Sequence, residues 1–314
     1  MLEESPENNR PSLEEEVPVS GETSDVDEPE MPAPEEAAAA SNCPTCQQAP
    51  QLVYALGNLG IDLVSEARLV SLGQGMPANT SPDNPADLLN YIKDNPFVFE
   101  AINWTLNIEN TPIYAIRPMG CYAHFAYDML YKFITEQMES LVQCVSIPGY
   151  THGQTALMSG LVVPNLVPVV RGMYSWNTAA LVNDLCGDPP EEGADQEEFS
   201  KKRSGIYNFL ERVYHELRNP GMLAQERALN YAASNAYQVA RVFEYAITEG
   251  LELDTIQVDK TPISRPSSDC WDVILVFFHP KHRQDVSRKA YRFTVDVSDV
   301  IPAMVGPLRQ WFVY

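Results

Sequence analysis

Two apolar runs near the end of the chain constrain its fold more than any other feature. Residues 270–278 read CWDVILVFF and are apolar on both faces of an extended strand, with Trp271, Val273, Leu275 and Phe277 on one face and Ile274, Val276 and Phe278 on the other. Such a strand is covered on both sides, so we expect it in the interior of a sheet. Residues 291–297, YRFTVDV, alternate instead, which predicts a half-buried neighbouring strand with Tyr291, Phe293, Val295 and Val297 inward.

Helical patterns precede this pair of strands. One apolar stripe joins Ile206, Phe209, Leu210, Val213 and Leu217, and a second, within residues 225–248, joins Leu229, Ala232, Ala233, Ala236, Ala240, Phe243 and Ile247. Asn219-Pro220-Gly221 separates them and predicts a helical hairpin. With a further strand at 255–260, residues 197–314 are predicted to form an α-α-β-β-β subdomain, with its helices packed on an antiparallel sheet.

The first half of the chain mixes strand and helix patterns. It predicts a strand from Leu52, a helix over 83–94, a hairpin over 102–118, several short strands over 142–174 and a short helix over 177–186. A helix over 124–138 is expected to bury Phe125, Met129, Phe133 and Met138 or their near neighbours. The acidic, breaker-rich stretch 187–196 follows. We therefore predict an α+β protein with a mixed α/β subdomain at 42–190.

Charge is distributed unevenly along the chain. The formal net charge is −22, and residues 1–40 hold thirteen acidic side chains against the single base Arg10, so we expect a disordered acidic tail over 1–41. An acidic surface disfavours binding to nucleic acid. Apolar runs long enough to span a bilayer are absent, and the N-terminus lacks the pattern of a secretory signal. These features predict a cytoplasmic protein with reduced cysteines.

The pair Cys43-Pro44-Thr45-Cys46 is the most specific local motif. Two thiolates at this spacing suit two corners of a tetrahedral zinc site. The remaining ligands could come from Cys121, Cys144, His124 or His152, or from the same pair in a second subunit of a homodimer. A redox role is the weaker interpretation because the motif follows an acidic tail rather than a strand. Absence of any metal is the third alternative.

Basic residues gather at one place, in the connection after the interior strand. Lys281, Arg283, Arg288, Lys289 and Arg292 form this cluster in an otherwise acidic chain. They are either solvated charge at a hairpin tip or a partner-binding surface for an acidic segment.

The sequence offers no positive case for an enzyme. His152-Gly153-Gln154-Thr155 reads as a glycine-containing turn, because the other signatures of a Ser-His-Asp triad are missing. There is neither a Walker loop nor a GxGxxG after a strand. The alternative is a hydrolase or redox enzyme that uses Cys46, His152 or Cys270.

Several longer stretches resemble one family. They are NWTLNIENTPIYAI, SIPG, VVRGMYSWNTAAL, RVYHELRNPG, ERALNYAASNA, SRPSSDCWDVILVFF and YRFTVDVSDVIP. Together they are similar to the C-terminal domain of the PatA/PatG-type cyanobactin maturation proteases, which act in the biosynthesis of ribosomal cyclic peptides. The resemblance runs from about Cys43 to Trp311 and leaves out the subtilisin-like protease domain.

The resemblance implies a role beside a peptidase rather than a peptidase activity. We expect a non-catalytic accessory module that dimerises, or that docks precursor peptide or a partner enzyme such as the protease. A zinc-stapled structural dimer without a ligand of its own is the competing interpretation.

Overall fold

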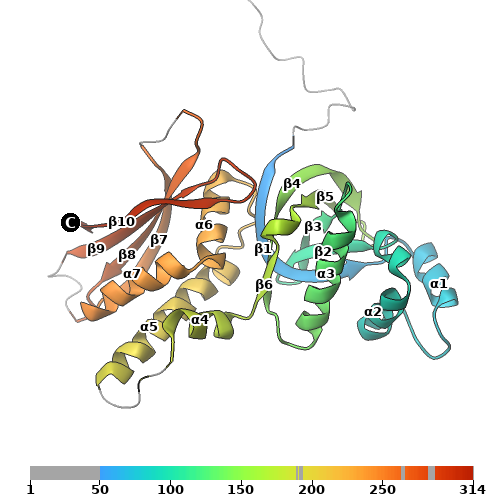
Figure 1. Cartoon of the computed structure of the whole chain (residues 1–314), viewed down its shortest axis with the longest axis horizontal. Coiled ribbons are helices and arrows are strands. Elements are labelled where there is room, and N and C mark those ends of the chain that lie inside the picture. The colour runs from blue at the N-terminus through green and yellow to red at the C-terminus, as the bar shows by residue number, and fades with distance from the viewer. Residues whose placement is uncertain (1–49, 189, 191–193, 263–265, 282–286, 314) are drawn as a thin grey trace, which may run out of the picture. The chain divides into compact units, whose positions relative to one another are not determined.

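The computed structural model describes residues 50–188, 190, 194–262, 266–281 and 287–313. It confirms the α+β class, with helices interspersed between two separate sheets (Figure 1). The predicted tail over 1–41, the zinc pair Cys43 and Cys46, and Arg283 of the basic cluster lie outside the described residues.

The first sheet closes into a barrel. Its strands are β1 (Leu52–Asp62), β2 (Asn103–Ile108), β3 (Thr111–Ile116), β4 (Cys144–Ala156), β5 (Val162–Pro168) and the short β6 (Tyr174–Trp176). They follow the order β1-β2-β3-β5-β4-β6, and β1 also pairs with β4, which closes the barrel. A parallel β3–β5 pair, and helix α3 (Ala123–Met138) between β3 and β4, complete the topology of an OB fold. We call residues 50–176 the barrel lobe.

Strand β1 closes the barrel because it changes partner halfway. Residues 52–57 pair with β4, and residues 58–62 pair with β2. Gly57 stands at the change, where an added Cβ would lie 2.4 Å from the carbonyl oxygen of Asn107. Beyond Gly57, where β4 no longer pairs with β1, the Gln137 side chain of α3 takes the place of the β4 backbone. Its Oε1 accepts from Leu59 N at 2.9 Å and its Nε2 donates to Leu59 O at 2.9 Å.

The helices of the barrel lobe cover its core. Between β1 and β2 lie α1 (Glu66–Gly75), α2 (Pro85–Asp94) and the 3-10 turn η1 (Pro96–Glu100), and a second 3-10 turn, η2 (Val170–Gly172), follows β5. Helix α2 buries Leu88, Leu89 and Ile92, as predicted from their spacing. Helix α3 buries Phe133 and near neighbours of the other expected residues, whereas Phe125 and Met138 themselves are 50% and 46% exposed. Tyr127 and Leu130, on the neighbouring stripe, contact the barrel core in their place.

The predicted hairpin over 102–118 is formed by β2 and β3. They pair antiparallel around a turn at Glu109 and Asn110, both of which have positive φ, 45° and 68°. Two such residues make the kind of tight turn whose twist matches that of paired strands.

The second sheet is open and antiparallel. Strands β7 (Glu252–Lys260), β8 (Cys270–Phe278), β9 (Arg288–Asp296) and β10 (Ala303–Val313) lie in the order β10-β9-β8-β7. The prediction that residues 270–278 form an interior strand is confirmed. Strand β10 was not predicted, because Gly306 and Pro307 interrupt it and most of its side chains are exposed. We call residues 178–313 the sheet lobe.

One face of this sheet carries the second core. Helices α4 (Thr178–Cys186), α5 (Ala194–Glu211), α6 (Ala224–Ser234) and α7 (Tyr237–Thr248) pack there against the predicted inward side chains of β8 and β9. The opposite face adds no side chain to this core; Val276 on it is buried, whereas Ile274 and Phe278 are half-buried. Both faces are therefore covered in part, and only one of them faces the core that the helices form.

Two local features change the predicted helical stripes. The first helix ends in a π turn, η3 (Arg212–Glu216), whose extra residue rotates the residues after it about the helix axis, so Leu217 is 49% exposed instead of buried. The second predicted helix is two helices, which break at Asn235 and Ala236. Nearly all of the predicted small residues are still buried, including Ala232, Ala233, Ala236 and Ala240.

The two lobes share β1. Its inward side chains Val53 and Ala55 belong to the barrel core, whereas Tyr54 and Leu56 point outward into the core of the sheet lobe. Tyr54 N donates to Gly221 O at 2.9 Å, and Asn230 Nδ2 donates to Tyr54 O at 2.9 Å. The outer edge of one β1 segment is thus hydrogen-bonded by the sheet lobe.

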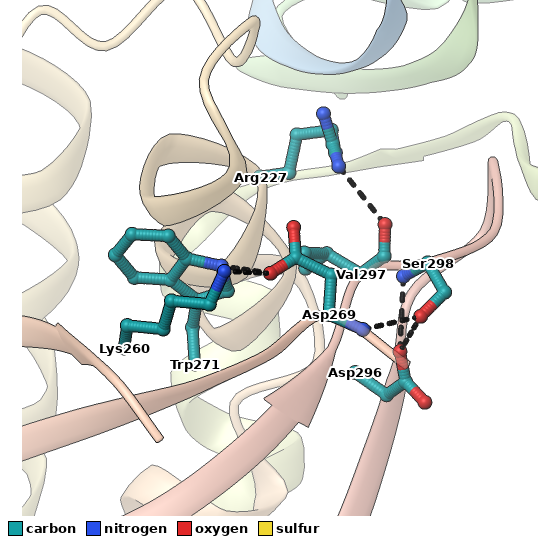
Figure 2. A network of polar contacts seen from close by, with 7 residues as sticks. All are labelled: Arg227, Lys260, Asp269, Trp271, Asp296, Val297 and Ser298. Carbon is teal, nitrogen blue, oxygen red and sulfur yellow. Dashed lines mark hydrogen bonds and ion pairs between the residues drawn. The ribbon is translucent and has the colours of Figure 1, made fainter. Parts of the chain in front are cut away.

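Arg227 of α6 ties the same region together. This buried guanidinium donates from Nη1 to the carbonyls of Leu52 and Met222, both at 3.3 Å, and from Nη2 to Val297 O at 2.9 Å. Figure 2 shows Val297 beside a network of hydrogen-bonded polar residues. In this network Asp269 N donates to Ser298 Oγ at 2.6 Å. Asp269 also accepts from Trp271 Nε1 at 3.0 Å. Burial lowers the pKa of Arg227, and its Nε has no partner among the described residues.

Candidate functional site

A polar cleft of about 360 Å³ lies where the barrel lobe meets the sheet lobe. The β2–β3 turn and the partner change of β1 form one side, and the end of α5 with its π turn forms the other. Its volume is within the range of pockets that bind small molecules or a few residues of a peptide. Side chains that line it include Asn58, Asn107, Glu109, Gln137, Gln143, Tyr207, Glu211, Tyr214, His215, Asn219 and Asn230.

The π turn sets which side chains face this cleft. Tyr214 points into the core, where its hydroxyl accepts from Trp176 Nε1 at 3.1 Å and donates to Ala233 O at 3.3 Å. Burial raises the pKa of Tyr214 well above its ordinary value, so this hydroxyl stays neutral. The next residue, His215, is exposed at the rim. Single π turns often occur at functional sites because they re-aim side chains in this way.

Charged groups from three elements meet at the rim. His215 Nδ1 lies 4.0 Å from a carboxylate oxygen of Glu109 on the β2–β3 turn, and His215 Nε2 lies 3.9 Å from one of Glu211 on α5. Arg218 forms a closer pair with Glu109, at 2.7 Å. The Glu211 carboxylate also raises the pKa of the neighbouring Tyr207 hydroxyl. The rim therefore holds two carboxylates, of which only Glu109 has a permanent cation beside it.

Most of the carboxamides in the cleft hold the protein's own backbone. Gln137 binds Leu59, Asn230 binds Tyr54 O, and Gln143 Oε1 accepts from Thr178 N at 3.2 Å. Asn219 Oδ1 likewise accepts from Gly221 N at 3.0 Å. Asn107 differs, because its buried Oδ1 has no hydrogen-bond partner within the described chain. The groups left over for a ligand are mainly acceptors.

The thiol in the cleft is a poor nucleophile. Cys144 is buried, and burial raises the pKa of its thiol to about 12. The thiolate is the reactive form of cysteine, so this side chain is inert at neutral pH. The arrangement of acceptors, an aromatic hydroxyl and an imidazole is better suited to holding N–H donors than to forming a covalent intermediate.

The predicted basic cluster is assembled, but much of its charge is neutralised. Arg288 pairs with Asp254 at 3.0 Å, Arg292 with Asp272 at 3.0 Å, and Lys289 with Glu249. Lys281 is exposed at the end of β8 and lines a second, larger groove of about 790 Å³. Partner binding by Lys281, Arg283, Arg288 and Lys289 stays a prediction.

The zinc prediction also stays a prediction, because Cys43 and Cys46 are not described. Of the further ligands considered, Cys121, His124 and His152 are exposed, whereas Cys144 is buried as a neutral thiol. Within the described ranges, no three His, Cys, Asp or Glu side chains gather as a metal site would require. In the same ranges, every helix is too short or too polar to traverse a bilayer.

The surface that OB folds commonly use for ligands is occupied here by the chain itself. That surface is the outer face of β2 and β3 with the β4–β5 loop. Asn103 on it is fully buried, and its amide bonds Asp62 at 2.9 Å and Arg117 at 2.6 Å. Met158 of the β4–β5 loop donates from N to Asp62 Oδ2 at 2.8 Å. The OB topology is therefore no evidence that this chain binds nucleic acid or sugar.

Sequence reasoning missed this cleft. Its residues come from positions as far apart as Asn58 and Asn230, and none carries a motif. The Glu-Asn turn at 109–110 was visible, but its neighbour His215 is brought to it by tertiary packing alone.

Comparison with known proteins agrees with the fold. Residues 52–153 match the family model described as "PatG Domain", and residues 195–311 match "PatG C-terminal". A solved structure titled "PatG Domain of Unknown Function" is similar at 37% identity with a TM-score of 0.72, over 84% of this chain and 99% of that one. No curated protein matched the chain. On the strength of these likenesses, the chain belongs to the PatG domain family.

Proposed function

We propose that this chain is a non-catalytic accessory module of cyanobactin-type cyclic-peptide biosynthesis, which binds precursor peptide in the polar cleft. The membership in the PatG domain family supports the pathway. The observation that carries the binding role is the set of hydrogen-bond acceptors that line the cleft. Asn107 Oδ1 has no partner among the described residues, and the Glu211 carboxylate and the Tyr207 hydroxyl, which interact with each other, line the same cavity. Four other carboxamides of the cavity are bonded to backbone.

A peptide in extended form offers what this cleft lacks. Its backbone N–H groups, its free amine or a basic side chain would donate to the acceptors, and the Tyr207 ring would cover it from one side. A buried acceptor without a partner is costly, so a ligand that supplies the missing donor gains affinity. The protonated thiol of Cys144 supports binding without turnover.

The test is titration of the full chain with a fluorophore-labelled linear precursor peptide of the cyanobactin type. We expect saturable binding, weakened about tenfold by Tyr207→Ala, a change of about 1.4 kcal/mol. Tyr245→Ala is the matched control, since Tyr207 and Tyr245 are 45% and 47% exposed on different helices. Absence of saturable binding, or equal losses in both variants, would count against the proposal.

Turnover is checked on the same samples by mass spectrometry. Prolonged incubation should leave the mass of the peptide unchanged. Cleavage that disappears in a Cys270→Ala or His152→Ala variant would instead support the alternative of a hydrolase, and loss of water would show a condensation and equally contradict a non-catalytic role. Neither of those side chains lines the cleft.

A further inference from the structure

The two edges of the open sheet differ in how well they are protected. At the β7 edge, a bulge interrupts the pairing between Leu253 and Thr255, and Arg212 Nη1 donates to Asp254 O at 3.1 Å. The strand also carries the acidic residues Glu252, Asp254 and Asp259. Bulges and charges are the usual means by which natural sheets prevent further pairing at an edge.

The β10 edge is more open over its last five residues. Within the described chain β10 pairs with β9 alone, and its bulge lies between Val305 and Arg309, so residues 309–313 form an uninterrupted stretch. Trp311 and Phe312 are 39% and 56% exposed, one on each face of the strand. An edge of this kind presents unpaired backbone N–H and C=O groups together with apolar side chains.

One charge at this edge lacks compensation. Arg309 is exposed and lies directly opposite Arg292 of β9. Arg292 is neutralised by Asp272, with Nη1 3.0 Å from Oδ2, whereas the guanidinium of Arg309 has no hydrogen bond or ion pair to any other described residue. Like charges opposite one another destabilise a pair of strands, so a carboxylate brought beside Arg309 would be favourable. Strand β10 itself contains no acidic residue.

From this edge we infer a second binding surface: residues 309–313 accept an extended acidic segment of a partner polypeptide as a fifth strand. The carboxylate of the segment pairs with Arg309, and an apolar side chain two residues away lies over Trp311 on the same face. The occupant is a different polypeptide rather than another copy of β10, because a second β10 would bring a further Arg309 and no carboxylate. This surface is separate from the cleft and does not depend on the proposed function.

The inference is tested with two labelled hexapeptides and the full chain. One is acetyl-Val-Thr-Glu-Thr-Val-Val-amide, in which a valine stands two residues to either side of the glutamate, and the other has lysine in place of glutamate. We expect the glutamate peptide to bind with Kd of about 0.1–1 mM and the lysine peptide about five- to tenfold more weakly. Arg309→Glu should reverse this preference without unfolding the protein, because the side chain is exposed.

Two controls make the result specific. Arg171→Glu reverses the charge of another exposed arginine, in η2 of the barrel lobe, and should leave the preference unchanged. A third peptide with proline in place of both threonines loses backbone donors and should bind far more weakly. Binding that ignores the Arg309 charge or tolerates the prolines would overturn strand addition. So would no binding at about 1 mM, or a dimer in sedimentation that Arg309→Glu dissociates.

Discussion

The two sheets of this chain manage their edges in different ways. The barrel lobe closes because β1 pairs with β4. Where this pairing ends, the Gln137 side chain bonds the backbone N–H and C=O of Leu59. The sheet lobe leaves two edges free and covers one face with helices. Closure removes edges altogether, whereas an open sheet must guard them one at a time. The barrel lobe is therefore suited to a structural role, and the sheet lobe to binding a partner at a sheet edge.

The two lobes are not independent bodies, because both contain side chains or hydrogen bonds of β1 in their structure. Its alternate side chains enter two different cores, and Gly221 and Asn230 bond its backbone from the sheet lobe. A strand that is buried on both faces cannot leave one lobe without disturbing the other. We expect the two lobes to unfold together.

The largest expected effect is that of Gly221→Ala. Gly221 has φ of 74°, and an added Cβ would lie 2.0 Å from Tyr54 O. Strain and displacement of β1 should together lower the free energy of unfolding by about 3–5 kcal/mol. Urea denaturation measures the loss, and hydrogen exchange should rise in β3 and β8 alike if the lobes are coupled.

Gly250→Ala is the matched control for that experiment. Gly250 has φ of 69°, but its Cβ would meet nothing within 4 Å. Backbone strain by itself should cost about 1 kcal/mol there. Equal costs at both sites would show that contact with Tyr54 is unimportant, and faster exchange in one lobe only would mean that the lobes unfold separately.

A smaller effect is expected from alkaline pH, acting where the lobes meet. Burial raises the pKa of Cys144 from 9.0 to about 12. Because the folded-state pKa lies above that of the unfolded chain, the stabilisation is complete below about pH 9 and is lost as the pH rises toward 12. The free energy of unfolding should fall by about 1.4 kcal/mol near pH 10 through this thiol.

Substitution identifies the group responsible. Cys144→Ala should flatten the dependence between about pH 9 and pH 10, at the expense of some stability at neutral pH. Cys121→Ala, which removes an exposed thiol, should leave the dependence as it is. A slope unchanged by Cys144→Ala would assign the alkaline loss to the buried tyrosines, of which Tyr54 and Tyr214 also have pKa values raised by burial.

The smallest effect concerns the two hydrogen bonds between Gln137 and Leu59 in the barrel lobe. Gln137→Leu removes both bonds to Leu59 and leaves its N–H and C=O without partners, which should cost about 1–2 kcal/mol. Lys132→Leu on the same helix, 67% exposed, should stay within about 0.5 kcal/mol in urea denaturation. If both variants were equally stable, water would have replaced the Gln137 amide as the hydrogen-bond partner of Leu59.

The sequence predicted those elements whose buried side chains recur at regular intervals along the chain. Apolar residues on both faces of 270–278 predicted an interior strand, alternation in 291–297 predicted its neighbour, and two extended runs within 102–118 predicted a hairpin. The sequence could not reveal barrel closure, because that depends on pairing between β1 and β4, which lie far apart in the sequence. Strand β10 was missed for a physical reason as well: an exposed edge strand has no apolar face to give it a period.

The candidate site was less predictable than the fold. A π turn adds a residue that no helical periodicity anticipates, and this residue decides that His215 meets Glu109 and Glu211. The basic cluster was recognised, but its partners Asp254, Asp272 and Glu249 come from β7, β8 and the end of α7. Charge read along a chain does not show which ions neutralise one another across a sheet.

The double burial of β1 has a consequence for a nascent chain leaving the ribosome. The barrel has all its strands once β5 has emerged, yet Tyr54, Leu56 and Cys144 still lack their cover from α6, which ends at Ser234. At about 5–20 residues per second, that apolar patch stays bare for roughly 3–13 s. A chaperone that shields it during this interval would raise the yield of folded protein more than one that acts after release.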